Sequence, residues 1–233
     1  MSDCNGKLVV FDLDDTLYKE RDFVASAYNT IASLLAEKYN LNVVEMIEIM
    51  TNAPINPFDS LAEYLKQYSD NSGVAIAEDI PWMIDAYRFH KPTLMLDEEF
   101  RATLTQLVAD GFRLGVITDG RTVSQMNKFY ALGLDAYFDC SLVLISEAIG
   151  ADKSQPDAFR RMMKQNPDIS QFYYVGDNPA KDFLWPNRLG WTTVQLNDDG
   201  RNVHPQSIEL PTDDYRPQFS INNLSDLLGI LIH

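Results

Sequence analysis

Two aspartates, Asp12 and Asp14, directly follow the apolar run Leu8-Val9-Val10-Phe11. In an extended backbone, residues two apart project to the same side, so we expect these carboxylates to share one face while Leu13 and Asp15 point away. Open α/β sheets bind ligands outside the carboxyl ends of their strands, where a reactive pair of carboxylates is expected. A solvated acidic turn would explain the same residues, so the pair alone leaves both interpretations open.

A second group of polar residues follows the apolar run 114–117. Thr118, Asp119 and Gly120 would place a hydroxyl and a turn with free backbone N–H groups just before a helix, an arrangement that can hold a phosphate. Thr118 could instead cap the helix, because Asp-Gly turns are common. Arg121 could contact a substrate or begin the helix, and the helix start is the favoured interpretation.

Lys153 lies just before a predicted helix start. Ser154 and Asp157 have the spacing of a capping box, and Pro156 suits a first helical turn. The spacing therefore places Lys153 at the mouth of a helix. Taken alone, a surface lysine is the simpler interpretation.

A fourth polar segment, Gly-Asp-Asn-Pro-Ala-Lys-Asp at 176–182, follows the apolar run 172–175. Gly176 permits a tight exit from a strand, and Pro179 suits the entry of a helix that Asp177 could cap. A capping role and a metal-binding role are compatible. Mg²⁺ favours carboxylate and carbonyl oxygens, which fits Asp12 and Asp177 at two neighbouring strand ends.

Elements that alternate along the chain must position these residues. Short apolar runs typical of buried parallel strands occur at 8–11, 114–117, 142–145, 172–175 and 191–194. Helical patterns are expected near 97–110, 121–132, 156–165, 179–188 and 223–231. Strands alternating with helices predict an α/β fold with a doubly wound, Rossmann-like parallel sheet.

The interval 18–93 has helical periodicity without a convincing buried strand, and it is too long for an ordinary connection. It predicts an inserted α-helical cap domain, with 1–17 and 94–233 forming the catalytic core. Additional core helices are the alternative interpretation. Residues 197–217, rich in Asp, Asn, Pro and Arg, are expected to form a surface excursion before the last strand and helix.

Composition limits the classes of function. The 233-residue chain is 45% hydrophobic, as globular proteins are, and its formal charge of −15 would repel nucleic acid and anionic lipid. Its N-terminus lacks a signal pattern, and no apolar run is long enough to span a membrane. Cys4 and Cys140 are far apart and indicate neither a disulfide framework nor a zinc site. We therefore expect a cytoplasmic protein without nucleic-acid or membrane partners.

Taken in order, Asp-Leu-Asp-Asp-Thr at 12–16, Thr118, Lys153 and the 176–182 segment resemble the four motifs of the haloacid dehalogenase superfamily. The resemblance covers the whole chain, because one subgroup of that superfamily inserts a helical cap between the first and second motifs. Its third motif usually has proline directly after the lysine, whereas Ser154 and Gln155 intervene here.

The resemblance implies a role for each matched residue. Asp12 would attack phosphorus and form an aspartyl-phosphate, and Asp14 would protonate the leaving oxygen and then activate water. Mg²⁺ would be held by the side chains of Asp12 and Asp177 and by the main-chain carbonyl of Asp14. The residues expected to bind the substrate phosphoryl group and neutralise its charge are Thr118, Asp119, Gly120 and Lys153, with Asp182 in support.

These residues favour a Mg²⁺-dependent phosphatase acting on a small phosphate monoester, either a sugar phosphate or a nucleotide. Dehalogenases of the superfamily lack an acid/base residue at the position of Asp14. A phosphonate hydrolase would need a cap lysine in a context that is absent here, and a receiver domain would lack the helical insertion. A phosphomutase and a non-catalytic binding protein of the same fold remain as alternatives.

Overall fold

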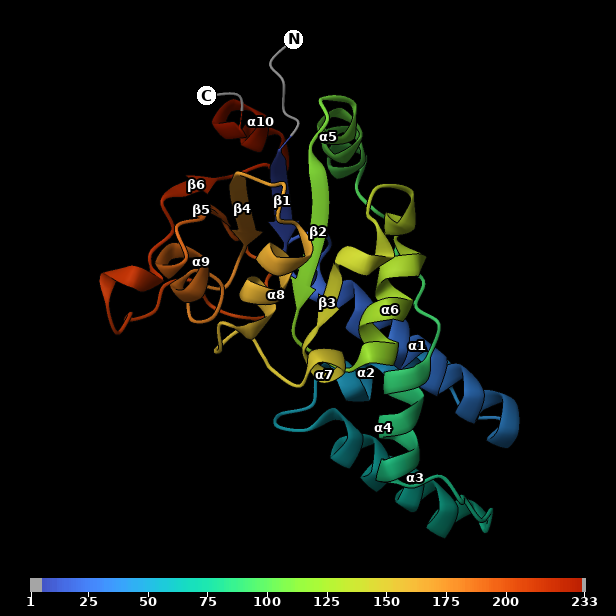
Figure 1. The fold of residues 1–233 in the computed structure, drawn as a ribbon. Coiled ribbons are helices and arrows are strands. Elements are labelled where there is room, and N and C mark those ends of the chain that lie inside the picture. The colour runs from blue at the N-terminus through green and yellow to red at the C-terminus, as the bar shows by residue number, and fades with distance from the viewer. Residues whose placement is uncertain (1–5, 232–233) are drawn as a thin grey trace. The chain divides into compact units, whose positions relative to one another are not determined.

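The computed structural model describes residues 6–231 (Figure 1). Residue contacts divide the chain into two compact units, Asp22–Thr93 and the remainder. Cys140 is an exposed free thiol, and Cys4 lies outside the described residues. Within the described chain, no helix combines the length and apolar character needed to cross a membrane.

The larger unit contains a six-stranded sheet in the order β3-β2-β1-β4-β5-β6. Every neighbouring pair of strands is parallel, which confirms the predicted doubly wound α/β fold. The strands are β1 (Lys7–Phe11), β2 (Arg113–Thr118), β3 (Val143–Ile145), β4 (Gln171–Gly176), β5 (Thr192–Leu196) and β6 (Phe219–Ile221).

Helices connect these strands and lie on both faces of the sheet (Figure 1). The helices are α5 (Glu98–Ala109), α6 (Thr122–Ala131), α7 (Ser146–Ile149), α8 (Asp157–Gln165), α9 (Leu184–Arg188) and α10 (Leu227–Leu231). Short 3-10 turns lie at Leu134–Ala136, Cys140–Leu142, Asp213–Tyr215 and Leu224–Asp226.

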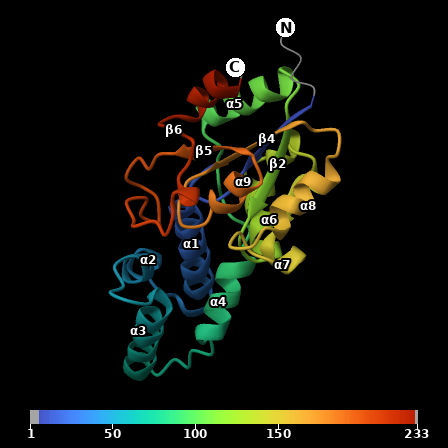
Figure 2. The ribbon, with the colours of Figure 1, turned by 60° about the vertical axis from the view of Figure 1, so that its left-hand side comes forward.

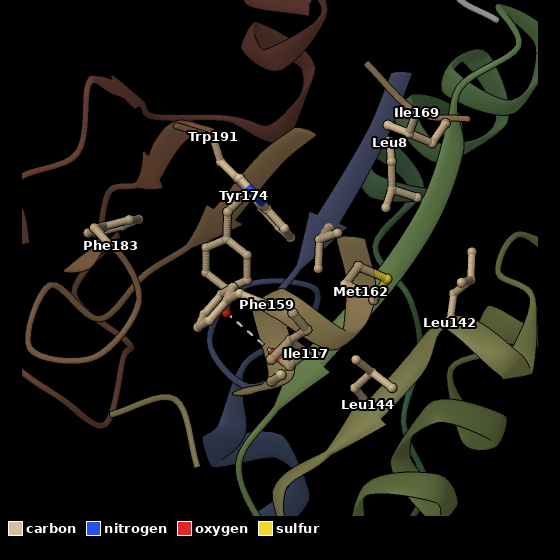
Figure 3. Close-up of a cluster of buried hydrophobic side chains, with 12 residues drawn as sticks. Leu8, Ile117, Leu142, Leu144, Phe159, Met162, Ile169, Tyr174, Phe183 and Trp191 are labelled. Carbon is tan, nitrogen blue, oxygen red and sulfur yellow. Dashed lines mark hydrogen bonds between the residues drawn. The ribbon is translucent and has the colours of Figure 1, made fainter. Parts of the chain in front are cut away.

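Side chains of β1 alternate between the two faces, as a pleated strand requires. Val10 belongs to a buried cluster with Phe159 of α8, part of which Figure 3 shows. Phe11 lies on the other face, where its ring centroid is 5.9 Å from that of Phe138. Phe138 packs in turn against Phe129 of α6. The predicted run 8–11 is therefore buried on both sides.

Two local expectations about helix starts are wrong. Pro156 is the N-cap residue of α8 and no side chain caps that helix, because the Ser154 hydroxyl donates to Asp152 instead of forming a capping box. The helix expected from residue 179 begins only at Leu184. Residues 178–182 form turns in which Asn178 Oδ1 accepts the N–H of Ala180 at 3.0 Å.

The predicted helical insertion contains α1 (Glu20–Tyr39), α2 (Val43–Thr51), α3 (Pro57–Ser72) and α4 (Ile80–Phe89). Figure 2 shows α2 beside α3, and the two helices are in contact. Asn42, Asn56 and Asp79 cap α2, α3 and α4, each accepting main-chain N–H groups of the first turn. The buried residues of this unit form a hydrophobic core of their own, which includes Ile31, Leu35, Met46, Leu61 and Met83. An insertion with its own core contradicts the alternative of additional core helices.

Candidate active site

The order of the strands reverses beside β1, because β1 lies between β2 and β4. The carboxyl ends of these three strands lead directly to Asp12, Thr118 and Asp177. Phe11 pairs in register with Val175, so Asp12 and Asp177 leave neighbouring strands at closely matched heights. Ligands of open α/β sheets bind at such a switch point.

Asp12 pairs with a lysine from the loop between α7 and α8. Its main-chain N–H donates to Val175 O at 2.9 Å, and its side chain is buried. Lys153 Nζ lies 2.9 Å from Asp12 Oδ2 and 2.6 Å from Asp182 Oδ1. Burial disfavours the charged ammonium, but the two carboxylates hold the pKa of Lys153 well above its usual value. A fixed cation therefore lies beside the predicted nucleophile.

Asp12, Asp177 and Asp182 form a buried cluster in which one oxygen of each lies within 4.8 Å of the others. Burial and the neighbouring carboxylates raise the pKa of Asp12 to about 8 and that of Asp177 to about 9, and Lys153 partly offsets these shifts. One ammonium cannot balance three carboxylates. The donor set therefore fits a hard divalent cation that takes oxygen ligands.

Asp182 is held by contacts on both of its oxygens. Oδ1 accepts from Lys153, and Oδ2 accepts the main-chain N–H of Asn178 at 2.8 Å. The hydroxyl of Tyr174 lies 3.4 Å from Oδ1, and Asp182 is fully buried. Asp182 therefore contacts both Lys153 and the main chain of the 176–182 segment.

Asp14 faces a different set of partners. Lys128 Nζ lies 2.7 Å from Oδ1, the Tyr18 hydroxyl donates to the same oxygen, and Gln125 Nε2 donates to Oδ2 at 2.8 Å. Burial acts to raise the pKa of Asp14, but the charge of Lys128 and these hydrogen bonds hold it below its ordinary value. Asp12 and Asp14 therefore lie in contrasting environments although one residue separates them.

The predicted phosphate-binding turn is only partly available. Thr118 is buried and its hydroxyl accepts from Gln125 at 2.6 Å, while Asp119 Oδ1 accepts the main-chain N–H of Lys153 at 3.0 Å. The N–H of Gly120 donates to Ser146 Oγ at 2.9 Å, so it is not the free donor that the sequence predicted. The turn offers the Thr118 side chain more readily than its glycine amide.

Arg121 is the N-cap residue of α6 and pairs with Glu147 at 2.9 Å. Glu147 also accepts the main-chain N–H of Thr122 at 2.8 Å. The hydrogen bonds that Glu147 accepts from the main-chain N–H of Thr122 and from Arg121 lower its pKa. These contacts match the interpretation of Arg121 as a helix start.

The segment expected to be a surface excursion folds back onto the site. Asn202 Nδ2 donates to Asp177 Oδ2 at 3.0 Å, and the amide of Gln206 donates to the main-chain oxygen of Asp177 at 2.8 Å. The main-chain N–H of Val203 donates to Asp15 Oδ2 at 2.7 Å. The expectation of a surface excursion is therefore wrong for Asn202, which is buried, whereas residues 203–205 are exposed as expected.

A small cavity of about 120 Å³ joins most of these groups. Its lining residues are Asp12, Asp14, Asp15, Glu20, Thr118, Asp119, Lys153, Asp177, Asn178, Lys181 and His204. Of the predicted site residues, Gly120 and Asp182 do not line this cavity. Asp15, expected to point away, does line it, and burial together with the charge of Asp14 raises the pKa of Glu20 to about 7. The cavity has room for a phosphoryl group.

The sequence did not point to several residues that contact the site. Gln125 and Lys128 lie on the buried face of α6 together with Phe129. Polar residues on the apolar face of a helix could have indicated a role in the site. Lys181 was visible inside the fourth motif. Asn202 and His204 carry no local signal, because their contacts depend on how the chain returns after β5.

The chain is similar to known phosphatases and hydrolases. A family model described as haloacid dehalogenase-like hydrolase matches residues 9–195. The chain is 30% identical over 232 residues to the glyceraldehyde 3-phosphate phosphatase of Methanocaldococcus jannaschii, covering 97% of this chain and 96% of that one. It is 30% identical over 131 residues to the pyrimidine 5'-nucleotidase YjjG of Escherichia coli, covering 55% and 54%.

Solved structures show the same fold. The HAD-hydrolase YfnB of Bacillus subtilis, bound to magnesium, gives a TM-score of 0.64 at 20% identity, covering 97% of this chain and 98% of that one. A 2-haloacid dehalogenase from Pseudomonas syringae pv. Tomato DC3000 gives a TM-score of 0.61 at 25% identity, again covering 97% and 98%.

Proposed function

The chain belongs to the haloacid dehalogenase-like hydrolases and is a phosphatase of that superfamily, and we propose that it hydrolyses a small sugar phosphate with Mg²⁺ through a phosphoryl-Asp12 intermediate. One observation carries the proposal. Two buried carboxylates, Asp12 and Asp177, lie at the switch point of the sheet with the ammonium of Lys153 2.9 Å from the first of them.

Asp12 and Asp14 carry out different steps of the proposed reaction. An oxygen of Asp12 attacks phosphorus and forms an acyl phosphate as the bond between phosphorus and the ester oxygen breaks. Asp14 gives a proton to the departing oxygen, so the product leaves as an alcohol. Asp14 then takes a proton from a water molecule whose oxygen attacks phosphorus, which frees inorganic phosphate and restores the Asp12 carboxylate.

Lys153 and Thr118 act on the phosphoryl oxygens in this proposal. The Lys153 ammonium is held in place by Asp182 and offers a positive charge beside Asp12. Thr118 offers a hydroxyl at the end of the neighbouring strand. Fixed donors of this kind stabilise charge that develops on the transferred group and need no reorganisation during the reaction.

Asp12 and Asp177 would hold Mg²⁺ with their side chains, together with the main-chain carbonyl of Asp14. When bound, the cation reduces the repulsion between an anionic nucleophile and an anionic phosphate. Asn202 fixes one oxygen of Asp177, and Lys153 and Asp182 complete the surrounding charges.

We propose a sugar phosphate as the substrate because of the relatives of this chain. The relatives that match over nearly the full chain are glyceraldehyde 3-phosphate phosphatases, whereas the nucleotidase matches over about half. These observations favour a short sugar phosphate over a nucleotide.

The test is phosphate release with and without Mg²⁺ from glyceraldehyde 3-phosphate, nucleoside monophosphates and p-nitrophenyl phosphate. We expect Mg²⁺-dependent release, the highest kcat/KM for the sugar phosphate, and no activity in Asp12→Asn. Mass spectrometry after acid quench should find a phosphoryl group on the peptide that contains Asp12. Absence of metal-dependent release across the panel would refute the function, and a preference for nucleotides would refute only the substrate class.

A further inference from the structure

Helix α6 carries two buried polar side chains that no step of the proposed reaction uses. Gln125 is 2% exposed and Lys128 is 4% exposed, three residues apart and therefore on one face of the helix. A buried ammonium is costly unless it is paired and hydrogen-bonded. Lys128 is paired with Asp14 at 2.7 Å.

The contacts of the Asp14 carboxylate are unequal. Oδ1 accepts from both Lys128 and the Tyr18 hydroxyl, whereas Oδ2 accepts from Gln125 at 2.8 Å. An ionised carboxylate has about four acceptor positions, two on each oxygen. Among the described residues, Oδ2 keeps an acceptor position that the hydrogen bonds do not fill.

Gln125 also joins two parts of the site. The same Nε2 that donates to Asp14 donates to Thr118 Oγ1 at 2.6 Å. Asp14 follows β1 and Thr118 ends β2, so one side chain of α6 sets the spacing between the acid/base group and the phosphate-binding hydroxyl.

We propose that Lys128 and Gln125 are positioning residues that fix the carboxyl of Asp14 so that proton exchange with the ester oxygen and with water takes place at Oδ2. The inference rests on the proposed function. Lys128 occupies Oδ1, and Gln125 fixes the rotation of the carboxyl and its distance from Thr118. Neither residue gains or loses a proton in the reaction.

A comparison of leaving groups separates positioning from simple packing. Cleavage of an alkyl phosphate needs a proton on the departing oxygen, whereas p-nitrophenolate leaves readily without one. Lys128→Met removes the cation and keeps the length of the side chain. We expect kcat/KM for glycerol 1-phosphate to fall about 10²-fold, the size of effect that follows from misplacing a reacting group by about 1 Å. The value for p-nitrophenyl phosphate should fall by less than about tenfold.

Three variants complete the design. Gln125→Met keeps the Lys128 charge, and we expect the same selective loss for the alkyl ester. Lys128→Arg keeps the positive charge and should recover part of the alkyl activity. Lys164→Met is the matched control, because Lys164 is exposed on α8 away from the cavity, and it should leave both activities unchanged.

Each outcome decides between the explanations. Equal losses for both substrates, or no loss, would overturn the positioning role. If Lys128→Met does not fold, as judged by its melting curve, Gln125→Met decides in the same way. Failure of the unmodified protein to hydrolyse either ester with Mg²⁺ would refute the proposed function itself, a result distinct from equal losses in an active protein.

Discussion

Gly176 ends β4 directly before Asp177, and the space beside it is already occupied. A Cβ placed on this residue would lie 2.5 Å from Asp182 Oδ2 and 2.7 Å from its Cγ. Ordinary van der Waals contacts begin near 3.4 Å, so the substitution Gly176→Ala requires a displacement of about 1 Å. Asp182 is fully buried and contacts Lys153 and the main-chain N–H of Asn178, so a displacement of its carboxylate would disturb both contacts.

The magnitude follows from these contacts. Overpacking in a filled interior typically costs about 1–3 kcal/mol, and breaking a buried ion pair costs about 3–5 kcal/mol. Because Lys153 keeps Asp12 as a partner, only part of the second cost applies. We expect Gly176→Ala to lower the free energy of unfolding by about 3 kcal/mol. Displacing Lys153 beside the reacting group should also lower kcat by about 10²-fold.

The assay is urea unfolding followed by circular dichroism, combined with a double-mutant cycle. Asp182→Ala removes the oxygen and Cγ that collide, so Gly176→Ala should cost at least about 2 kcal/mol less in that background. Gly229→Ala is the matched control, because no atom lies within 4 Å of its added Cβ and the residue lies in α10. A single substitution that costs less than about 0.5 kcal/mol, or a cycle in which the effects simply add, would refute the reasoning.

Three further predictions concern the acid/base residue, the metal site and pH. Asp14→Asn should lower turnover by about 10²–10⁴-fold, and unchanged turnover would reject its acid/base role. Asn202→Ala should raise the Mg²⁺ concentration for half-maximal activity by about 10–100-fold, because it orients Asp177; an unchanged Mg²⁺ titration would contradict this. Burial raises the pKa of Asp12 to about 8 and of Asp177 to about 9, whereas the unfolded chain releases the same protons near pH 4. Proton binding by these two groups therefore stabilises the metal-free fold relative to the unfolded chain. That stabilisation is lost as the pH rises through about 8–9. Mg²⁺ should therefore raise the melting temperature more at about pH 8.5 than at about pH 6, and equal increases would show that these groups do not set the difference.

The parts of the site that the sequence predicted depend on local patterns. The runs that form β1, β2 and β4 are apolar and short, and their chemistry follows immediately at residues 12, 118 and 177. Because parallel strands place their carboxyl ends at one edge, finding the strands was enough to bring those residues together. The haloacid dehalogenase resemblance is confirmed by the family model that matches residues 9–195.

The parts that the sequence did not predict depend on contacts between distant residues. The helix expected at residue 179 starts later because Asp182 accepts the N–H of Asn178 and binds Lys153, which holds this segment in turns. Asp15 is tied to Val203, 188 positions away, and no periodic pattern reports such a contact. The local sequence around Pro179 favours a helix start, but the contacts of Asp182 with Asn178 and Lys153 hold this segment in turns.

Asp12 and Asp14 lie in contrasting environments. Both come from one five-residue motif, yet burial raises the pKa of Asp12 while Lys128 and its neighbours lower that of Asp14. Asp14 is therefore the carboxylate that stays ionised to lower pH, and a bound divalent cation would favour the ionised form of Asp12 as well. Lys128 of α6 lowers the pKa of Asp14, whereas Lys153 from the loop after α7 only partly offsets the effect of burial on Asp12. The motif therefore supplies the two carboxylates, and residues far from it in the sequence make them unequal.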